Sequence, residues 1–135
     1  MSINKIEGIV TSGLGEGTFF MSMEHYKKEI KNRLGFDAYP GTLNLRIEEK
    51  MSFAKQNSFF QNPIKIDGFK ADNKKFGGAT CYKAKIKNIN GAIIIPEINK
   101  YKNKGVIEFI ANINLREKLK LKDGDIIKIS LSQRE

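Results

Sequence analysis

The sequence has very little of the sulfur and imidazole chemistry that proteins use for cross-linking and for zinc binding. Its 135 residues include one cysteine, Cys81, and one histidine, His25. A lone cysteine cannot form an internal disulfide and is typical of a reducing compartment. These two side chains are too few for a zinc site of the usual kind, so a bound metal would have to be a hard cation with oxygen ligands. We therefore expect a cytoplasmic protein.

Long apolar segments are also missing. No stretch approaches the ~18 to 20 consecutive apolar residues that a membrane span requires. Residues 1–5 lack the apolar core of a secretion signal. With 40% hydrophobic and 29% charged residues, the composition is that of an ordinary globular protein. We expect residues 1–135 to form one domain that does not bind membranes.

The net charge is strongly positive. A charge of +9 at pH 7 favours anionic partners such as nucleic acid, nucleotides or acidic membranes. A lysine-rich composition alone would produce the same charge, so the charge identifies no site. Lys83, Lys85 and Lys87 alternate along one predicted strand, which indicates a solvated face.

Short segments rich in β-branched residues and separated by Gly, Asn or Asp dominate the sequence. In the clearest of them Leu43, Leu45 and Ile47 alternate with polar residues, as in a half-buried strand. The dipeptides Asn90-Gly91 and Asp123-Gly124 predict turns. The segments that we expect to form strands are residues 6–11, 18–21, 42–47, 64–66, 79–87, 92–95, 106–111 and 125–131.

Two segments predict helices. Ser22 is suited to the N-cap of the first helix, and Gly35 to the left-handed residue that ends it. Tyr26, Ile30 and Leu34 recur every four residues and would form its buried stripe.

The second helix is short. Asn114, followed three residues later by Glu117, is a capping-box pattern that opens a helix through Leu119. Many short strands with only two helices predict a mainly β protein, a closed barrel flanked by the helices. The segment 51–62 has no clear pattern and is compatible with an ordered loop or a lid.

A glycine-rich segment follows the first predicted strand. Gly13, Gly15 and Gly17 leave the backbone free to approach a ligand and to turn its amides toward an anion. No Gly-Lys-Ser/Thr sequence follows, and a strand rather than a helix comes next. The segment is therefore neither a Walker A loop nor a dinucleotide fingerprint. A phosphate-binding loop and a mobile hairpin loop both remain open.

Two polar residues share one face of the strand 42–47. In a strand the Cα atoms of Thr42 and Asn44 lie ~7 Å apart, and the Thr42 hydroxyl and the Asn44 amide point to the same side. Mg²⁺ bound to phosphates often takes only one or two oxygens from the protein, so this pair could hold it. The alternative is an ordinary polar outer face of a barrel strand.

Glu108 and Arg116 are further candidates. Glu108 lies in an otherwise apolar strand, either as an outward-facing edge residue or as a desolvated carboxylate that orients a hydroxyl or accepts its proton. Arg116 lies at the start of the second helix, where free amides suit an anion or a base edge, although plain capping explains Asn114 equally well. We expect His25 to be a surface residue and Cys81 a small core residue.

Taken in order, these motifs resemble the archaeal CTP-dependent riboflavin kinase family. The resemblance spans nearly the whole chain and leaves only about residues 51–75 poorly matched. The segments that carry it are Ser12-Gly13-Leu14-Gly15-Glu16-Gly17, Leu34-Gly35-Phe36, Gly41-Thr42-Leu43-Asn44-Leu45, Gly91-Ala92-Ile93-Ile94-Ile95-Pro96, Glu108-Phe109-Ile110-Ala111, Leu115-Arg116-Glu117 and Leu121-Lys122-Asp123-Gly124-Asp125.

The resemblance implies a six-stranded cradle-loop (RIFT-like) Greek-key β-barrel. It also implies transfer of the γ-phosphate of CTP to the 5′-hydroxyl of riboflavin, which yields CDP and FMN, with Mg²⁺ bound by Thr42 and Asn44. Glu108 would contact the flavin beside the reacting hydroxyl and act as the catalytic residue. The residues expected to bind the nucleotide are Gly13, Leu14, Gly15, Glu16, Gly17, Thr18, Ile113, Asn114, Leu115 and Arg116. We expect a monomer.

One departure from the family pattern keeps an alternative open. The family usually carries a threonine that contacts the flavin eight residues before the glutamate, and this sequence has Lys100 there. A catalytically inactive relative that binds flavin or nucleotide is therefore one alternative. A nucleic-acid-binding barrel is another, favoured by the positive charge. Aromatic residues do not interleave with basic ones as single-strand binders require, so we do not expect nucleic acid as a partner.

Overall fold

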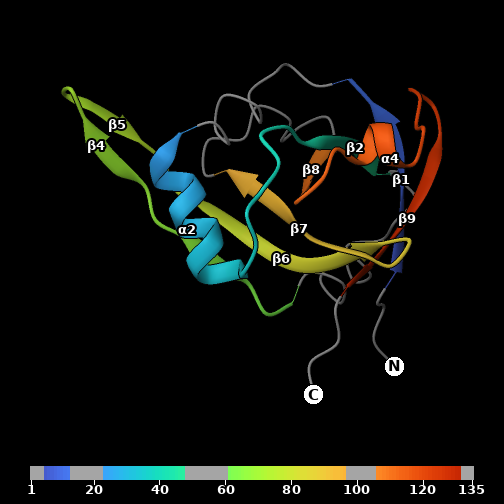
Figure 1. Cartoon of the computed structure of the whole chain (residues 1–135), viewed down its shortest axis with the longest axis horizontal. Coiled ribbons are helices and arrows are strands. Elements are labelled where there is room, and N and C mark those ends of the chain that lie inside the picture. Colours follow the sequence, from blue (N-terminus) through green and yellow to red (C-terminus); the bar gives the residue numbers. More distant parts are fainter. Residues whose placement is uncertain (1–4, 13–22, 48–60, 97–105, 132–135) are drawn as a thin grey trace.

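The computed structural model describes residues 5–12, 23–47, 61–96 and 106–131 (Figure 1). The strand expected at 18–21, the glycine-rich segment 13–18 and Lys100 lie outside the described residues. The elements of the described residues are the strands β1 (Lys5–Thr11), β2 (Leu43–Ile47), β3 (Ile64–Ile66), β4 (Phe69–Ala71), β5 (Lys74–Phe76), β6 (Ala79–Ile86), β7 (Ile89–Pro96), β8 (Val106–Ala111) and β9 (Ile126–Leu131) and the helices α2 (Glu24–Leu34) and α4 (Leu115–Lys118).

Six of these strands close into an antiparallel barrel. The main sheet has the order β3-β6-β7-β8-β2-β1-β9, and β6 also pairs with β9, which joins the two ends. β3 adds to the free edge of β6 beside this junction. The expected closed six-stranded barrel with two short helices is confirmed. Neither helix of the described residues is long and apolar enough to cross a membrane.

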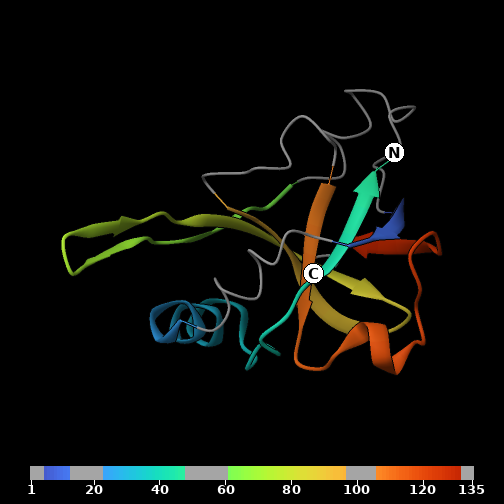
Figure 2. The same cartoon turned by 90° about the horizontal axis from the view of Figure 1, so that it is seen from above.

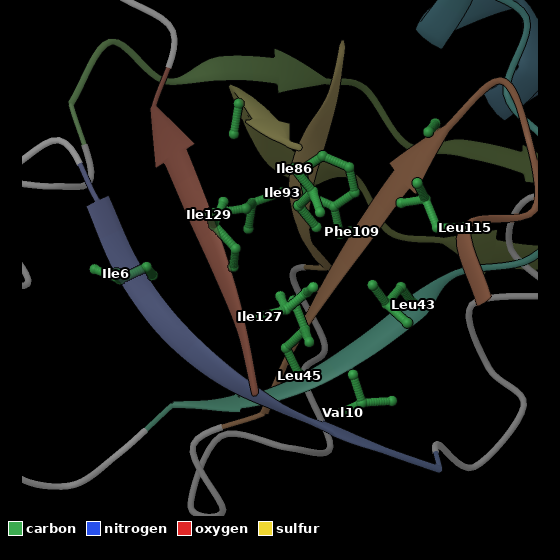
Figure 3. Packing of buried hydrophobic residues seen from close by; sticks show 12 residues of the cluster. Ile6, Val10, Leu43, Leu45, Ile86, Ile93, Phe109, Leu115, Ile127 and Ile129 are labelled. Carbon is green, nitrogen blue, oxygen red and sulfur yellow. The ribbon is translucent and has the colours of Figure 1, made fainter. Parts of the chain in front are cut away.

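The barrel interior is filled by the inward side chains of its strands (Figure 3). Leu43 and Leu45 are buried, as their alternation predicts, and they pack with Phe109 in one cluster. Each large apolar side chain that is fully buried contributes about 1.5–3 kcal/mol to stability. The interior residues labelled in Figure 3 are Ile6, Val10, Leu43, Leu45, Ile86, Ile93, Phe109, Leu115, Ile127 and Ile129.

Helix α2 covers part of the barrel's outer surface, beside β6 in Figure 1. Tyr26, Ile30 and Leu34 are buried against a second apolar cluster that includes Cys81 and Ile110, so the predicted stripe is confirmed. Burial raises the pKa of the Cys81 thiol to about 12. The thiol therefore stays protonated at neutral pH and acts as a small core residue, as expected.

The ends of α2 match the sequence signals in part. Gly35 has φ 89°, and its N–H donates to the carbonyls of Ile30 and Lys31, which closes the helix as predicted. The predicted N-cap was one residue off. Met23, not Ser22, occupies the N-cap position, and its side chain makes no capping hydrogen bond. The C-terminal signal was the more reliable one because it requires a left-handed conformation that residues other than glycine rarely adopt.

The turn predicted at Asn90-Gly91 is wrong, since both residues lie inside β7. The chain turns instead at Lys87 and Asn88, which have φ 47° and 70°, as a two-residue hairpin turn requires. Gly91 is needed for another reason. A Cβ atom there would lie 2.2 Å from the carbonyl oxygen of Ile110 and 2.6 Å from the Phe109 ring.

A second hairpin, formed by β4 and β5, was not expected. It turns at Asp72 and Asn73, both with positive φ, and extends away from the barrel (Figures 1 and 2). Phe69 and Phe76 stack across it with ring centroids 4.9 Å apart. The sequence did contain a signal for this hairpin: Asp72 and Asn73, residue types that favour turns, lie between Phe69 and Phe76.

Replacing Gly91 by Ala should destabilise the barrel by about 2 kcal/mol, because the added methyl group meets backbone that cannot move without disturbing the pairing of β7 with β8. Urea unfolding measures the change. Asn90→Ala, an exposed substitution in the same strand, is the control and should stay within about 0.5 kcal/mol of the parent. Equal effects of the two substitutions would contradict the close approach at Gly91.

Candidate functional site

A row of polar residues crosses three neighbouring strands on the outside of the barrel. Thr11 of β1 lies opposite Asn44 of β2, and Asn44 lies opposite Glu108 of β8. Their neighbours Leu43 and Phe109 point into the interior, so the row faces outward. Residues that are 97 positions apart in the sequence (108 − 11) thereby form one continuous polar strip.

Glu108 is buried, with 3% of its surface exposed. The Thr42 hydroxyl donates a hydrogen bond of 2.8 Å to its Oε1 atom. Of the two possibilities left open by the sequence, the desolvated carboxylate is therefore correct and the exposed edge residue is wrong. Because the Thr42 hydroxyl uses its only hydrogen for Glu108, its lone pairs remain available to accept or to ligate.

The Asn44 side chain carries an oxygen with unmet bonding capacity. Its Oδ1 atom is buried and has no hydrogen-bond partner among the described residues. A buried carbonyl without a partner costs free energy, so its persistence calls for an explanation. Together with the Thr42 hydroxyl it offers two neutral oxygens, which fits a hard cation such as Mg²⁺ that takes few protein ligands.

A cavity of about 550 Å³ adjoins Thr42 at one mouth of the barrel. This volume lies in the range of small-molecule sites. Thr42 bonds Glu108 of the polar row and also lines the cavity. All four residues predicted to bind the nucleotide from the second helix line the cavity. The lining residues are Tyr39, Pro40, Gly41, Thr42, Leu43, Phe109, Ala111, Ile113, Asn114, Leu115, Arg116 and Glu117.

Asn114 connects two walls of this cavity. Its Oδ1 accepts a hydrogen bond of 3.1 Å from the Glu117 amide, which confirms the predicted cap of α4. Its Nδ2 donates to the Tyr39 hydroxyl at 3.2 Å. Tyr39, whose own amide donates to the Ala111 carbonyl at 2.7 Å, was missed in the sequence. An aromatic residue just before Gly41-Thr42 was the only available signal.

Arg116 reaches from α4 to Asp123, with which it forms an ion pair. Asp123 also accepts a hydrogen bond of 2.8 Å from the Ser12 hydroxyl. These hydrogen bonds, mainly the one from Arg116, hold the pKa of the Asp123 carboxyl below its usual range. The sequence motif around Asp123 predicted a turn but not this contact.

The glycine-rich segment itself, Gly13 to Thr18, lies outside the described residues, and so does Lys100. The entry to the glycine segment is described. Thr11 pairs with Asn44, and Ser12 is the last described residue before Gly13. The described chain therefore reaches the start of this segment beside the polar row.

A second cavity, of about 410 Å³, lies at the other end of β1. Lys5, Lys85, Lys87 and Lys128 line it, and no ion pair joins any of them to a carboxylate within the described ranges. The expected solvated face is confirmed for Lys83, Lys85 and Lys87, which are exposed. None of the residues predicted to bind substrate lines this cavity.

The fold and the site define a class of protein, a small closed β-barrel with a row of polar residues and an adjoining cavity. Comparison with known proteins names the family. The model for CTP-dependent riboflavin kinase, described as "Domain of unknown function DUF120", matches residues 10–131. This chain belongs to that family.

Curated relatives agree with the family assignment. The riboflavin kinase of Archaeoglobus fulgidus is 41% identical over 127 residues, which cover 94% of this chain and 54% of the relative. The riboflavin kinase of Methanocella arvoryzae is 42% identical over 126 residues, which cover 93% of this chain and 56% of the relative. The riboflavin kinase of Ignicoccus hospitalis is 35% identical over 124 residues, which cover 92% of this chain and 69% of the relative. The chain thus spans about half the length of the first two relatives.

Replacing Thr42 by Val should lower the free energy of unfolding by about 2 kcal/mol, because it removes the hydroxyl that bonds the buried Glu108 carboxylate. Thr42→Ser keeps the donor and should restore most of the loss. Thr80→Val is the matched control, at a half-buried threonine whose hydroxyl accepts a hydrogen bond from the exposed Lys65. Urea unfolding of the three variants checks this, and equal losses for both valine variants would contradict it.

Proposed function

We propose that this chain transfers the γ-phosphate of CTP to the 5′-hydroxyl of riboflavin and so produces CDP and FMN. The single observation that carries the proposal is the register that aligns Thr11, Asn44 and Glu108. It brings the entry to the glycine-rich segment, a candidate metal ligand and a buried carboxylate into one row. Membership of the family supports riboflavin and a nucleotide as the substrates.

The nucleotide would lie between the glycine-rich segment and α4. Backbone amides of Gly13 to Thr18 would hold its phosphates, since glycine lets the chain approach an anion closely. Arg116 would add charge-assisted hydrogen bonds to a phosphate. The polar edges at Ile113 and Asn114 would select the cytosine, because a site that pairs one base edge rejects a base without the matching groups.

Thr42 and Asn44 would hold Mg²⁺ through their neutral oxygens. The ion would supply neutralisation of the charge on the transferring phosphoryl group. The unpaired Asn44 Oδ1 atom and the lone pairs of the Thr42 hydroxyl support this role.

Glu108 would orient the ribityl 5′-hydroxyl of riboflavin and accept its proton. The 5′-oxygen forms a bond to the γ-phosphorus, while the bond between that phosphorus and the β–γ bridging oxygen breaks, and CDP leaves with the electron pair. The Thr42 hydrogen bond fixes the carboxylate for this task. Lys100, in the place of the family threonine, would contact the flavin or the phosphate of the product.

Incubation with riboflavin, Mg²⁺ and each of the four nucleoside triphosphates, followed by chromatographic detection of FMN, tests the proposal. We expect FMN with CTP and much less with the other three. Binding of riboflavin or nucleotide without any FMN would identify an inactive relative instead. The cytoplasmic location and the monomeric state remain predictions from the sequence.

Replacing Asn44 by Leu should abolish Mg²⁺-dependent turnover and leave the fold intact, since the substitution removes the amide oxygen from the metal site and no hydrogen bond from the described structure. Asn90→Leu, the same substitution at an exposed strand position, is the control and should keep full activity. Unfolding by urea verifies both folds. Full turnover in Asn44→Leu would remove Asn44 from the metal site.

Replacing Glu108 by Gln should slow FMN formation about 100-fold or more if the carboxylate accepts the proton, because general-base catalysis contributes about that much. Glutamine can still accept the Thr42 hydrogen bond, so the site should keep its geometry. Single-turnover kinetics measure the chemical step. A decrease of only a few-fold would reduce Glu108 to an orienting contact.

The lysine-lined cavity favours a second candidate function, which is binding of a nucleic-acid backbone. Its four lysines converge from β1, β6, the turn after β6 and β9, without a facing carboxylate among the residues that line it. A gel shift that weakens with salt, combined with no thermal shift upon CTP addition, would support this function over the kinase. Lys85→Gln with Lys128→Gln should then abolish the gel shift.

A further inference from the structure

The turn of residues 122–125, between α4 and β9, is held firmly against the end of β1. The Lys122 amide donates to the Asp125 carboxylate at 2.8 Å, and the Asp125 amide returns a bond of 3.0 Å to the Lys122 carbonyl. The Gly124 amide donates to the Val10 carbonyl, and the Val10 amide donates to the Asp125 carbonyl, both at 2.8 Å. The backbone on either side of Asp123 is therefore fixed relative to the point where the chain enters the glycine-rich segment.

The two carboxylate oxygens of Asp123 bond two different parts of the candidate nucleotide site. Oδ2 accepts from the Ser12 hydroxyl at 2.8 Å, and Ser12 directly precedes Gly13. Oδ1 accepts from Nη2 of Arg116, which lines the larger cavity. One side chain thus links the start of the glycine-rich segment to the arginine, and its bond to Ser12 spans 111 residues of sequence.

Stability does not explain this arrangement. The Arg116 and Asp123 side chains are 41% and 57% exposed, and exposed ion pairs stabilise proteins little. Geometry explains it better. A guanidinium group has five N–H donors, and the bond from Nη2 to Asp123 leaves donors of Nε and Nη1 for a phosphate. The Asp123 carboxylate is charged throughout the neutral pH range, and the hydrogen bond from Arg116 lowers its pKa further.

We propose that Asp123 is a positioning residue for the triphosphate of the nucleotide: it presets Arg116 and Ser12, the residue directly before the glycine-rich segment, in the geometry that phosphate binding needs. The proposal rests on the proposed function only in placing a phosphate at Arg116. When the guanidinium is already fixed before the ligand binds, less side-chain conformational entropy is lost on binding. The alternative is that Asp123 opposes phosphate binding. A carboxylate that competes with phosphate for Arg116 would weaken binding, and its removal would strengthen it.

Asp123→Asn tests the proposal because it removes the charge and keeps the size. Calorimetric titration with CDP and Mg²⁺ should show affinity about tenfold weaker than in the parent. In steady-state kinetics the KM for CTP should rise by a similar factor while the KM for riboflavin stays unchanged. The thermal midpoint should not move. Asp37→Asn, which breaks another exposed ion pair with Lys31, is the control and should change neither constant.

Combination with Arg116→Gln identifies the route of the effect. If Asp123 acts through Arg116, the double variant should bind CDP almost as tightly as Arg116→Gln alone. The small remaining loss should equal the loss that Ser12→Ala causes by itself, since Asp123 also bonds Ser12. A full tenfold loss from Asp123→Asn in the Arg116→Gln background would overturn the proposal. Unchanged or tighter CDP binding by Asp123→Asn would also overturn it.

The calorimetric test does not depend on turnover. A parent protein that binds CDP but forms no FMN would refute the proposed kinase and leave the comparison of affinities valid. A parent protein that binds neither CDP nor inorganic pyrophosphate would refute both proposals, because Arg116 would then have no phosphate to receive.

Discussion

The antiparallel register between β2 and β8 is the constraint on which the site depends. Leu43 and Leu45 on one strand and Phe109 on the other must point into the barrel to fill its interior. Because side chains alternate along a strand, this requirement turns Asn44 and Glu108 to the same outer surface. A slip of one residue would bring the carboxylate into the core and expose the phenylalanine. Packing of the interior therefore sets the geometry of the polar row.

Strand β8 is covered on both of its faces, as β7 is. Phe109 packs inside the barrel, and Ile110 packs in the cluster beneath α2. A strand buried on both faces reads as a continuous apolar run, which is how this segment reads apart from Glu108. A carboxylate in such a place must be compensated, and the Thr42 hydroxyl provides one hydrogen bond. The unpaired Asn44 oxygen beside it is a second departure from ordinary core chemistry, and such departures are expected at functional sites.

Local patterns in the sequence predicted local structure well. The buried stripe of α2, the Gly35 terminus, the Asn114 cap and the alternation in β2 all depend on neighbours within a few residues, and all are confirmed. The Asn90-Gly91 pattern predicted the wrong feature, because the glycine is required by its close approach to Ile110 and to the ring of Phe109, 18 residues away in the chain. Local propensity cannot reveal such a distant neighbour.

In the candidate site, too, local features could be predicted from the sequence and contacts between distant segments could not. Thr42, Asn44 and Glu108 were selected by residue type and by resemblance, but whether Glu108 was buried depended on strand pairing. The contacts of Tyr39 with Asn114 and of Asp123 with Ser12 join segments 75 and 111 residues apart. No short motif encodes them. The resemblance to a family supplied the order of the motifs, and the structure supplied the distances between them.

The barrel is joined unevenly around its circumference. Among the described residues, β6 shares eight residue pairs with β7 but two with β9, and β3 pairs with three residues further along the same edge of β6. Within this part of the chain the junction of β6 with β9 has the fewest paired residues of the closed sheet, so thermal fluctuations should separate the strands there first. The polar row crosses β1, β2 and β8, whose mutual pairings lie elsewhere in the ring. The molecule can thus loosen on one side while its reactive groups keep their alignment.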